Sequence, residues 1–150
     1  MSPVIRSAQA GELTHLIDES TLLLQSLYPE ESNHLVDASD FGAPGNMLLG
    51  AFIDSHAIGC VGLLRTSPEE GEIKRLFVNP HHRGKGIARD LMSRLESDAL
   101  TQGITTLRLE TGIHQPESMA LYESLGYLVR SPFGSYAEDP LSVFMEKKLS

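Results

Sequence analysis

The segment from Leu76 to Ala88 constrains the fold most strongly, because an apolar run passes through two glycines directly into an amphipathic helix. The run Leu76–Val78 is typical of the end of a strand, and the glycines, Gly84 and Gly86, lie in the turn that follows. The helix expected after the turn has an apolar face formed by Ala88, Leu91, Met92, Leu95 and Ala99. A strand, a glycine turn and a helix in this order predict an α/β unit.

The same turn is a candidate anion site. The first N–H groups of a helix have no partners within the helix and carry the positive end of its dipole. Glycines let a ligand approach the backbone, and positive charge is supplied by Arg83, Lys85 and Arg89. A dinucleotide fingerprint needs a third glycine where Arg89 stands, and a Walker A loop needs a different glycine spacing. On the loop alone, a turn without a ligand remains an alternative.

Apolar periodicity predicts alternating strands and helices along the chain. Strands are expected at Val4–Ala8, Met47–Ile53, Ala57–Arg65, Glu70–Val78, Thr105–Thr111, Tyr127–Val129 and Leu141–Met145. Helices are expected from about Ala10 to Leu27, over Asn33–Ala38, from the glycine turn to Gly103, and from Pro116 to Gly126. The order predicts an α/β fold with one mixed sheet of about seven strands, flanked by about four helices, in a single domain spanning residues 1–150.

Composition narrows the classes of partner. The net charge of −8 disfavours nucleic acid and anionic membranes. No apolar stretch approaches the ~20 residues of a membrane span, and the N-terminus lacks the apolar region of a signal peptide, so we expect a cytoplasmic protein. The single cysteine, Cys60, excludes an intrachain disulfide and is expected to be a buried core residue. The six histidines show no metal-ligand spacing, so we expect no metal.

Two motifs resemble those of the GNAT superfamily, the acetyl-CoA-dependent N-acetyltransferases. Arg83-Gly-Lys-Gly-Ile-Ala88 is similar to the family signature Gln/Arg-x-x-Gly-x-Gly/Ala, and Gln115 to Tyr127 resembles the segment Asn-x-x-Ala-x-x-x-Tyr-x-x-x-Gly-Phe. The chain departs from the second pattern at Gln115, Ser118 and Tyr127, and we interpret the last two as packing variations. The resemblance covers nearly the whole chain and is closest to small single-domain bacterial members.

The resemblance implies where acetyl-CoA, the cosubstrate, binds. The pantetheine arm would lie along the strand residues Leu76, Phe77 and Val78. The diphosphate would lie over the N–H groups of the residues in the first motif, which are Arg83, Gly84, Lys85, Gly86, Ile87 and Ala88. Gln115, where the family often has Asn, is expected to make a further polar contact to the cofactor.

The resemblance also suggests two catalytic residues. Glu72 is the candidate base that takes a proton from the amine, and its alternative is a solvent-facing strand glutamate in an acidic segment. Tyr122 is the candidate acid that protonates the departing thiolate, and its alternative is a core tyrosine with its hydroxyl on a carbonyl. The N–H of Val78 is the expected donor to the oxyanion.

The resemblance places the acceptor pocket between the first helices, the loop after them and the C-terminal hairpin. Arg75 and Arg108 could bind a substrate carboxylate or pair with acidic residues of the sheet, Glu110 could bind an ammonium group, and Tyr28 is a further candidate. The implied function is N-acetylation of a primary amine of a small molecule by direct attack in a ternary complex. Alternatives are a non-catalytic acyl-CoA-binding regulatory module, or acetylation of protein N-termini or lysines. A homodimer is a possible assembly.

Overall fold

A computed structural model describes residues 2–33 and 36–150. The strands are β1 (Val4–Ser7), β2 (Met47–Ile53), β3 (His56–Ser67), β4 (Glu70–Val78), β5 (Thr106–Gly112), β6 (Leu128–Arg130) and β7 (Ser142–Lys148). The α-helices within the described residues are α1 (Thr14–Leu27), α2 (Ile87–Thr101) and α3 (Pro116–Ser124). The predicted mixed α/β fold is therefore confirmed. Each expected strand is present; β2 and β4 have the predicted bounds, and the ends of the others shift by at most three residues.

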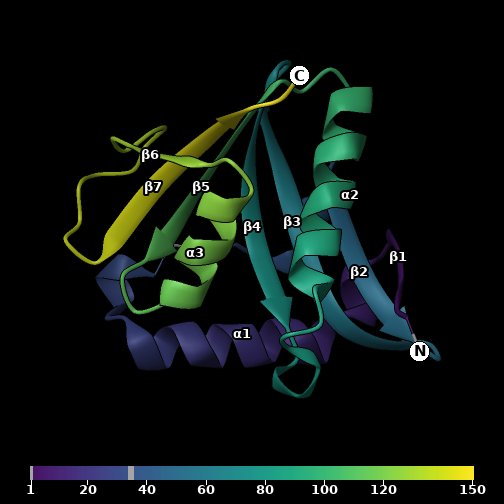
Figure 1. Cartoon of the computed structure of the whole chain (residues 1–150). Coiled ribbons are helices and arrows are strands. Elements are labelled where there is room, and N and C mark those ends of the chain that lie inside the picture. The colour runs from purple at the N-terminus through teal and green to yellow at the C-terminus, as the bar shows by residue number, and fades with distance from the viewer. Residues whose placement is uncertain (1, 34–35) are drawn as a thin grey trace.

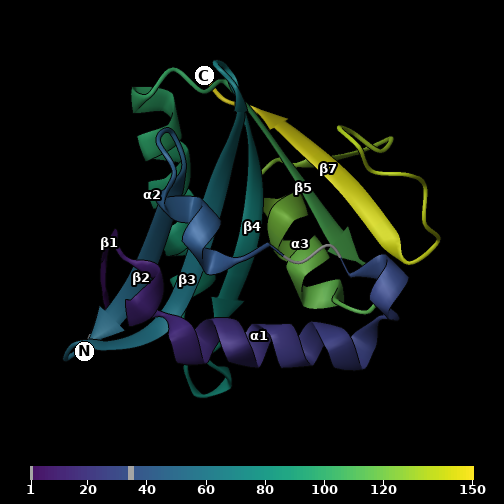
Figure 2. The ribbon, with the colours of Figure 1, turned by 180° about the vertical axis from the view of Figure 1, so that it is seen from behind.

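The seven strands form one sheet in the order β1-β2-β3-β4-β5-β7-β6. The central pair β4–β5 is parallel, and the other neighbours are antiparallel. Helices α2 and α3 cover one face of the sheet (Figure 1), whereas α1 crosses the other face near the C-terminal end of β4 (Figure 2). The N-terminus of α2 lies at that same end of β4, so the glycine turn and α1 flank the end of one central strand.

Apolar periodicity explains how the helices are held on the sheet. In α2 the predicted apolar face is buried, with Leu91, Met92, Leu95 and Ala99 all fully covered. On the other face, Leu13, Leu16 and Ile17 pack with Phe41, Phe52 and Cys60. Cys60 is fully buried, as predicted. Within the described residues no helix is long and apolar enough to span a membrane.

Two helical predictions need correction. The segment Ala10–Glu12 forms a 3-10 turn, and α1 begins only at Thr14. The helix expected over Asn33–Ala38 includes residues 34 and 35, which lie outside the described residues. Asn33 and Asp37 on either side of them have extended backbones, and short 3-10 turns occur instead at Glu30–Ser32 and Ala38–Gly42. The sequence there has no sustained apolar periodicity to support a helix.

The β4–β5 pair opens in the middle of the sheet. Pairing runs from Glu70↔Thr106 to Ile73↔Leu109, and β4 then continues to Val78 without a partner on that side in the described residues. The two strands diverge visibly toward the end of β4 (Figure 1). Main-chain groups along this edge of β4 are therefore available to a ligand.

Candidate active site

The glycine turn after β4 presents helix N–H groups to an open space. Gly84 and Gly86 have φ of 76° and 80°, in the left-handed region that glycine adopts readily. Gly86 caps α2, and its carbonyl accepts the Asp90 N–H at 3.0 Å. A Cβ added at either glycine would meet no atom within 4 Å. The N–H groups in the first turn of α2, which have no partners within the helix, can therefore receive an anion.

A cavity of about 630 Å³ extends from this turn along β4 to α3. It contains most of the residues predicted to bind the cofactor, namely Leu76, Phe77, Val78, Arg83, Gly84, Gly86, Ile87, Ala88 and Gln115. We call this cavity the cofactor groove. Lys85, which is exposed to solvent, does not line it. Arg89 does line the groove and its guanidinium donates to the Ser124 hydroxyl at 2.7 Å.

Val78 turns its main-chain groups toward the groove. Gly59 faces Val78 across the β3–β4 ladder, and the neighbouring bond runs from the Asn79 N–H to the Ile58 carbonyl at 2.8 Å. This pattern marks a non-hydrogen-bonded antiparallel pair, so the N–H and C=O of Val78 point away from β3. The carbonyl accepts the Arg83 Nε–H at 3.0 Å. An extended ligand could displace Arg83 from this carbonyl and form hydrogen bonds with the edge of β4.

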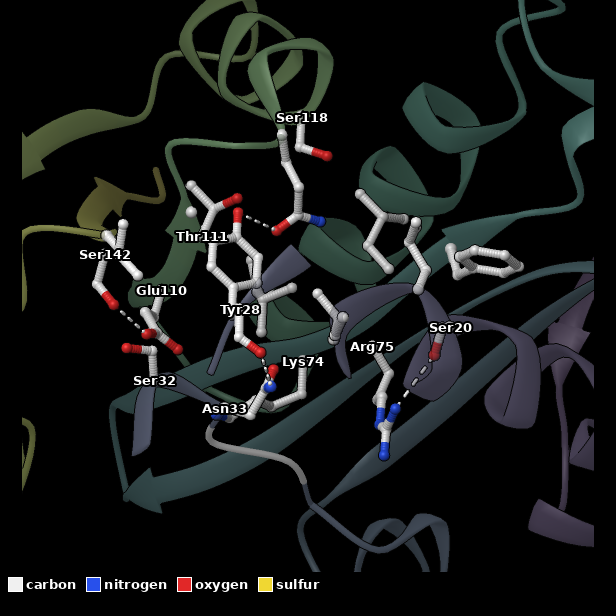
Figure 3. A pocket seen from close by; sticks show the side chains of 18 of the residues that line it. Ser20, Tyr28, Ser32, Asn33, Lys74, Arg75, Glu110, Thr111, Ser118 and Ser142 are labelled. Carbon is white, nitrogen blue, oxygen red and sulfur yellow. Dashed lines mark hydrogen bonds between the residues drawn. The ribbon is translucent and has the colours of Figure 1, made fainter. Parts of the chain in front are cut away.

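A second cavity, of about 110 Å³, lies on the α1 side of the opening between β4 and β5. The charged and polar residues that line it come from several elements of the fold. They are Ser20, Asn33, Lys74, Arg75, Glu110, Thr111 and Ser142 (Figure 3). We call it the acceptor cavity. It shares Leu23, Leu76, Phe77, Gln115 and Ser118 with the cofactor groove, so the two spaces meet beside β4.

Tyr122 projects from α3 into the acceptor cavity and is otherwise buried. Its ring packs edge-on against Tyr127 at 5.8 Å. Within the described part of the chain no group forms a hydrogen bond with its hydroxyl, so the alternative of a hydroxyl held by a carbonyl has no contact to support it. Burial raises the pKa of Tyr122, which keeps the phenol protonated at neutral pH.

The two candidate carboxylates have different surroundings. Glu72 is buried and lines neither cavity; Tyr136 Oη donates to its Oε2 at 2.5 Å, and Lys74 Nζ lies 3.1 Å from the same oxygen. Lys74 also donates to Tyr136 Oη. Glu110 lines the acceptor cavity and accepts the Ser142 hydroxyl at 2.7 Å (Figure 3). Lys74 therefore stands between Glu72 and the cavity that Glu110 faces.

The two predicted arginines are separated by the fold. Arg108 lines neither cavity, because it bridges Glu70 and Glu146, each at 2.7 Å. Arg75 lines the acceptor cavity, where its guanidinium donates to Ser20 Oγ at 3.1 Å and to Thr21 Oγ1 at 2.8 Å. Arg108 therefore pairs with acidic residues of the sheet, which was the alternative to binding a substrate carboxylate.

Tyr28 connects α1 to the turn before α3. Its hydroxyl accepts the His114 N–H at 3.1 Å and donates to Gln115 Oε1 at 3.2 Å. Gly112 makes room for this ring, since a Cβ there would lie 1.9 Å from the Tyr28 oxygen. Donation to Oε1 leaves the amide nitrogen of Gln115 as the group available to a ligand.

Sequence reasoning missed several lining residues. Ser118 lines both cavities, a position that its interpretation as a packing variation did not anticipate. Ser142 reaches Glu110 only because β7 pairs with β5, a contact between residues 32 positions apart. Ser118 could have been found from its place one turn before Tyr122 on the same helix. Ser142 carries no comparable local signal.

Comparison with known proteins agrees with this geometry. Residues 13–127 match the model of the Acetyltransferase (GNAT) family. The chain is 43% identical over 138 residues to the IAA acetyltransferase of Azospirillum brasilense (91% of this chain, 90% of the relative). It is 32% identical over 140 residues to the N-acetyltransferase YsnE of Bacillus subtilis (92% and 93%).

Solved structures share the fold. A structure described as an acyl-CoA N-acyltransferase from Klebsiella pneumoniae superposes with a TM-score of 0.83 at 33% identity, covering 99% of this chain and 98% of the other. The PaiA N-acetyltransferase of Thermoplasma acidophilum, in complex with coenzyme A, superposes with a TM-score of 0.77 at 24% identity over 99% of both chains. The chain therefore belongs to the acetyltransferase (GNAT) family and is an acetyl-CoA-dependent N-acetyltransferase.

Proposed function

We propose that the enzyme transfers the acetyl group of acetyl-CoA to a primary amine of a small molecule, by direct attack in a ternary complex. The observation that carries this proposal is the junction of the two cavities beside Leu76, Gln115 and Ser118. A thioester held in the groove and an amine held in the acceptor cavity would meet at this junction. The small size of the acceptor cavity, about 110 Å³, favours the end of a small molecule or a single side chain.

The cofactor groove supplies the donor site. The diphosphate of acetyl-CoA would receive the N–H groups between Arg83 and Ala88, with Arg89 adding positive charge at the groove wall. The pantetheine arm would bond to the N–H and C=O of Val78 in the manner of an added strand, and Arg83 would release that carbonyl. The thioester oxygen would then lie near the Val78 N–H, the proposed donor to the oxyanion.

Glu110 is the carboxylate that geometry favours as the base, because it lines the acceptor cavity and Glu72 does not. An ammonium group bound at Glu110 would lose one proton there, and the free amine would attack the thioester carbonyl carbon. The C–N bond forms, the C–S bond breaks, and the thiolate takes the proton of Tyr122. A second proton leaves the nitrogen and returns to Tyr122 through solvent, so the net release is one proton. Glu72 would hold Lys74 and Tyr136 in place.

Two alternative functions differ from this proposal in which cavity they would use and in what would enter it. A non-catalytic acyl-CoA-binding module would need only the groove, and the acceptor cavity, which Tyr122 lines, would have no role. Protein acetylation would need a peptide to enter the same small cavity. The name of the A. brasilense relative, IAA acetyltransferase, refers to IAA and not to a protein, which favours the small-molecule proposal. Cytoplasmic location and dimerisation stay predictions.

Release of coenzyme A tests these alternatives. The protein is incubated with acetyl-CoA, a thiol-detecting dye, and separate panels of small primary amines and of peptides. The proposal predicts thiol release that depends on a small amine, with the acetylated amine identified by mass spectrometry. Tight binding of acetyl-CoA without release in either panel would favour the binding module, and release with peptides alone would favour protein acetylation.

A further inference from the structure

Strand β4, which lines the cofactor groove, contains a bulge between Lys74 and Phe77. Cys60 pairs with Phe77 and Gly62 pairs with Lys74, so a two-residue step on β3 faces a three-residue step on β4. Arg75, inside the extra step, has φ of 62°. The other non-glycine residues with positive φ in the described chain, Asp54 and Ser55, lie in the β2–β3 turn. A left-handed conformation is costly for arginine, so surrounding contacts must hold it.

A buried thiol holds the main chain of the bulge. Cys60 Sγ donates to the Arg75 carbonyl at 3.3 Å, so a side chain of β3 contacts the main chain inside the bulge. Burial raises the pKa of the Cys60 thiol to about 12, against smaller opposite effects of Arg75 and of the Phe77 N–H. The group therefore remains a protonated thiol and a permanent donor at neutral pH.

The Arg75 side chain holds the bulge from the other direction. Its guanidinium donates to Ser20 Oγ and Thr21 Oγ1 of α1, and its Nη2 donates to the Val36 carbonyl at 3.1 Å. These partners are neutral, and among the described residues no carboxylate lies within ion-pair distance of it. Nε–H also points to the Val36 carbonyl, at 3.4 Å, so four of the five N–H groups are used to fix position. This leaves too few for two-point binding of a substrate carboxylate.

The bulge lies where a small movement would matter for the reaction. It follows Ile73, the last residue paired with β5, and precedes Val78, whose main-chain groups face the cofactor groove. Between these points β4 has no partner on its β5 side in the described residues. We propose that Cys60 and Arg75 are positioning residues that hold the bulge so that the Leu76–Val78 backbone meets the acetyl thioester. This inference rests on the proposed function.

Paired variants test the thiol contact. Cys60→Ser keeps a hydroxyl that can donate to the Arg75 carbonyl, whereas Cys60→Ala removes the donor. With the amine identified in the panel, Cys60→Ala should lower kcat about tenfold, as expected for one lost hydrogen bond, and Cys60→Ser should stay within about threefold of wild type. The dissociation constant of coenzyme A, measured by calorimetry, should change less than about twofold in both, because the diphosphate site is remote from the bulge.

Arginine variants test the second contact. Arg75→Met should lower kcat about tenfold, and the double variant with Cys60→Ala should be little worse than either single variant, because both side chains hold one bulge. Arg94→Met, which removes a surface arginine paired with Asp98, is the control and should keep wild-type kcat. If Arg75→Met does not fold, Arg75→Gly replaces it, since glycine accepts the backbone angle, and the same loss is expected.

Two results would overturn the inference: wild-type kcat in the folded Cys60→Ala and Arg75 variants, or an equal loss in Cys60→Ser and Cys60→Ala. If instead the proposed function is wrong, the wild-type protein itself would bind no acetyl-CoA or release no coenzyme A, so the two failures can be told apart.

Discussion

Tyr122 is the residue whose surroundings point most directly to chemistry. It is buried, it lines the acceptor cavity, and burial raises its pKa, so it stays a proton donor across the neutral range. Replacing Tyr122 by Phe should lower kcat by about 10²-fold, the effect typical of a lost general acid, with the dissociation constant of acetyl-CoA nearly unchanged. Steady-state kinetics and calorimetry on the same preparation check this. An unaltered kcat would remove Tyr122 from the mechanism.

The roles of Glu110 and Glu72 can be separated by their amide variants. Glu110→Gln should lower kcat about 10²-fold near neutral pH and recover partly at high pH, where the amine is already deprotonated. Glu72→Gln should have a smaller effect on kcat, because Glu72 contacts Tyr136 and Lys74 and not the cavity. The measurement is the pH profile of kcat for both variants. The opposite ranking would restore Glu72 as the base.

Part of the site was predictable from sequence at this scale, and part was not. The cofactor side was, because Leu76–Ala88 is one continuous segment whose glycines and helix start act locally. The acceptor side was predicted only in part. Tyr28, Arg75 and Glu110 were candidates and line the cavity, whereas Ser142 was missed because it reaches Glu110 only through the pairing of β5 with β7. The same reasoning explains why Arg75 and Arg108 looked equivalent in sequence although only Arg75 lines the cavity.

Among the elements, the glycine turn before α2 is the one whose geometry controls ligand entry. Gly86→Trp should abolish binding of acetyl-CoA, because a side chain at this position projects into the open space where the diphosphate is expected. Gly134→Trp is the matched control, since Gly134 also has a left-handed backbone and open surroundings but lies in the loop before β7. Calorimetry should show binding for the control only. Binding by Gly86→Trp would move the diphosphate elsewhere.

Strands and long helices were predicted because their apolar residues become buried, along one face of α2 and on both faces of β2 and β3. The bulge in β4 was not predicted, because its register depends on how Cys60 and Gly62 of β3 pair with Phe77 and Lys74. Nor did a short apolar stretch such as Asn33–Ala38 carry enough periodicity to predict its structure. Local pattern therefore predicts which elements exist, and tertiary pairing decides where they bend and end.

At the scale of the whole molecule, Arg108 joins β4, β5 and β7 through Glu70 and Glu146. Hydrogen bonds from Arg108 lower the pKa of Glu146, and a bond from Ser67 together with the charge of Arg108 lowers the pKa of Glu70. A lowered carboxyl pKa stabilises the fold above its unfolded value of about 4.3, and this stability is lost as pH falls through the folded value.

Arg108→Met should accordingly lower the free energy of unfolding by about 1–2 kcal/mol at pH 7, a figure reduced for partial exposure of Glu70. The difference from wild type should shrink below about pH 4, as the carboxylates become protonated. Urea titrations at several pH values check this. KM for the amine should not change, and a large rise in KM would instead assign Arg108 to the acceptor site.

The proposed reaction requires acetyl-CoA to occupy the groove between β4 and the start of α2, in a chain whose net charge of −8 would otherwise repel a polyanion. Isothermal titration of the folded wild-type protein with acetyl-CoA measures this directly. We expect saturable heat with one molecule bound per chain. The absence of saturable heat from the folded protein would contradict the proposed reaction.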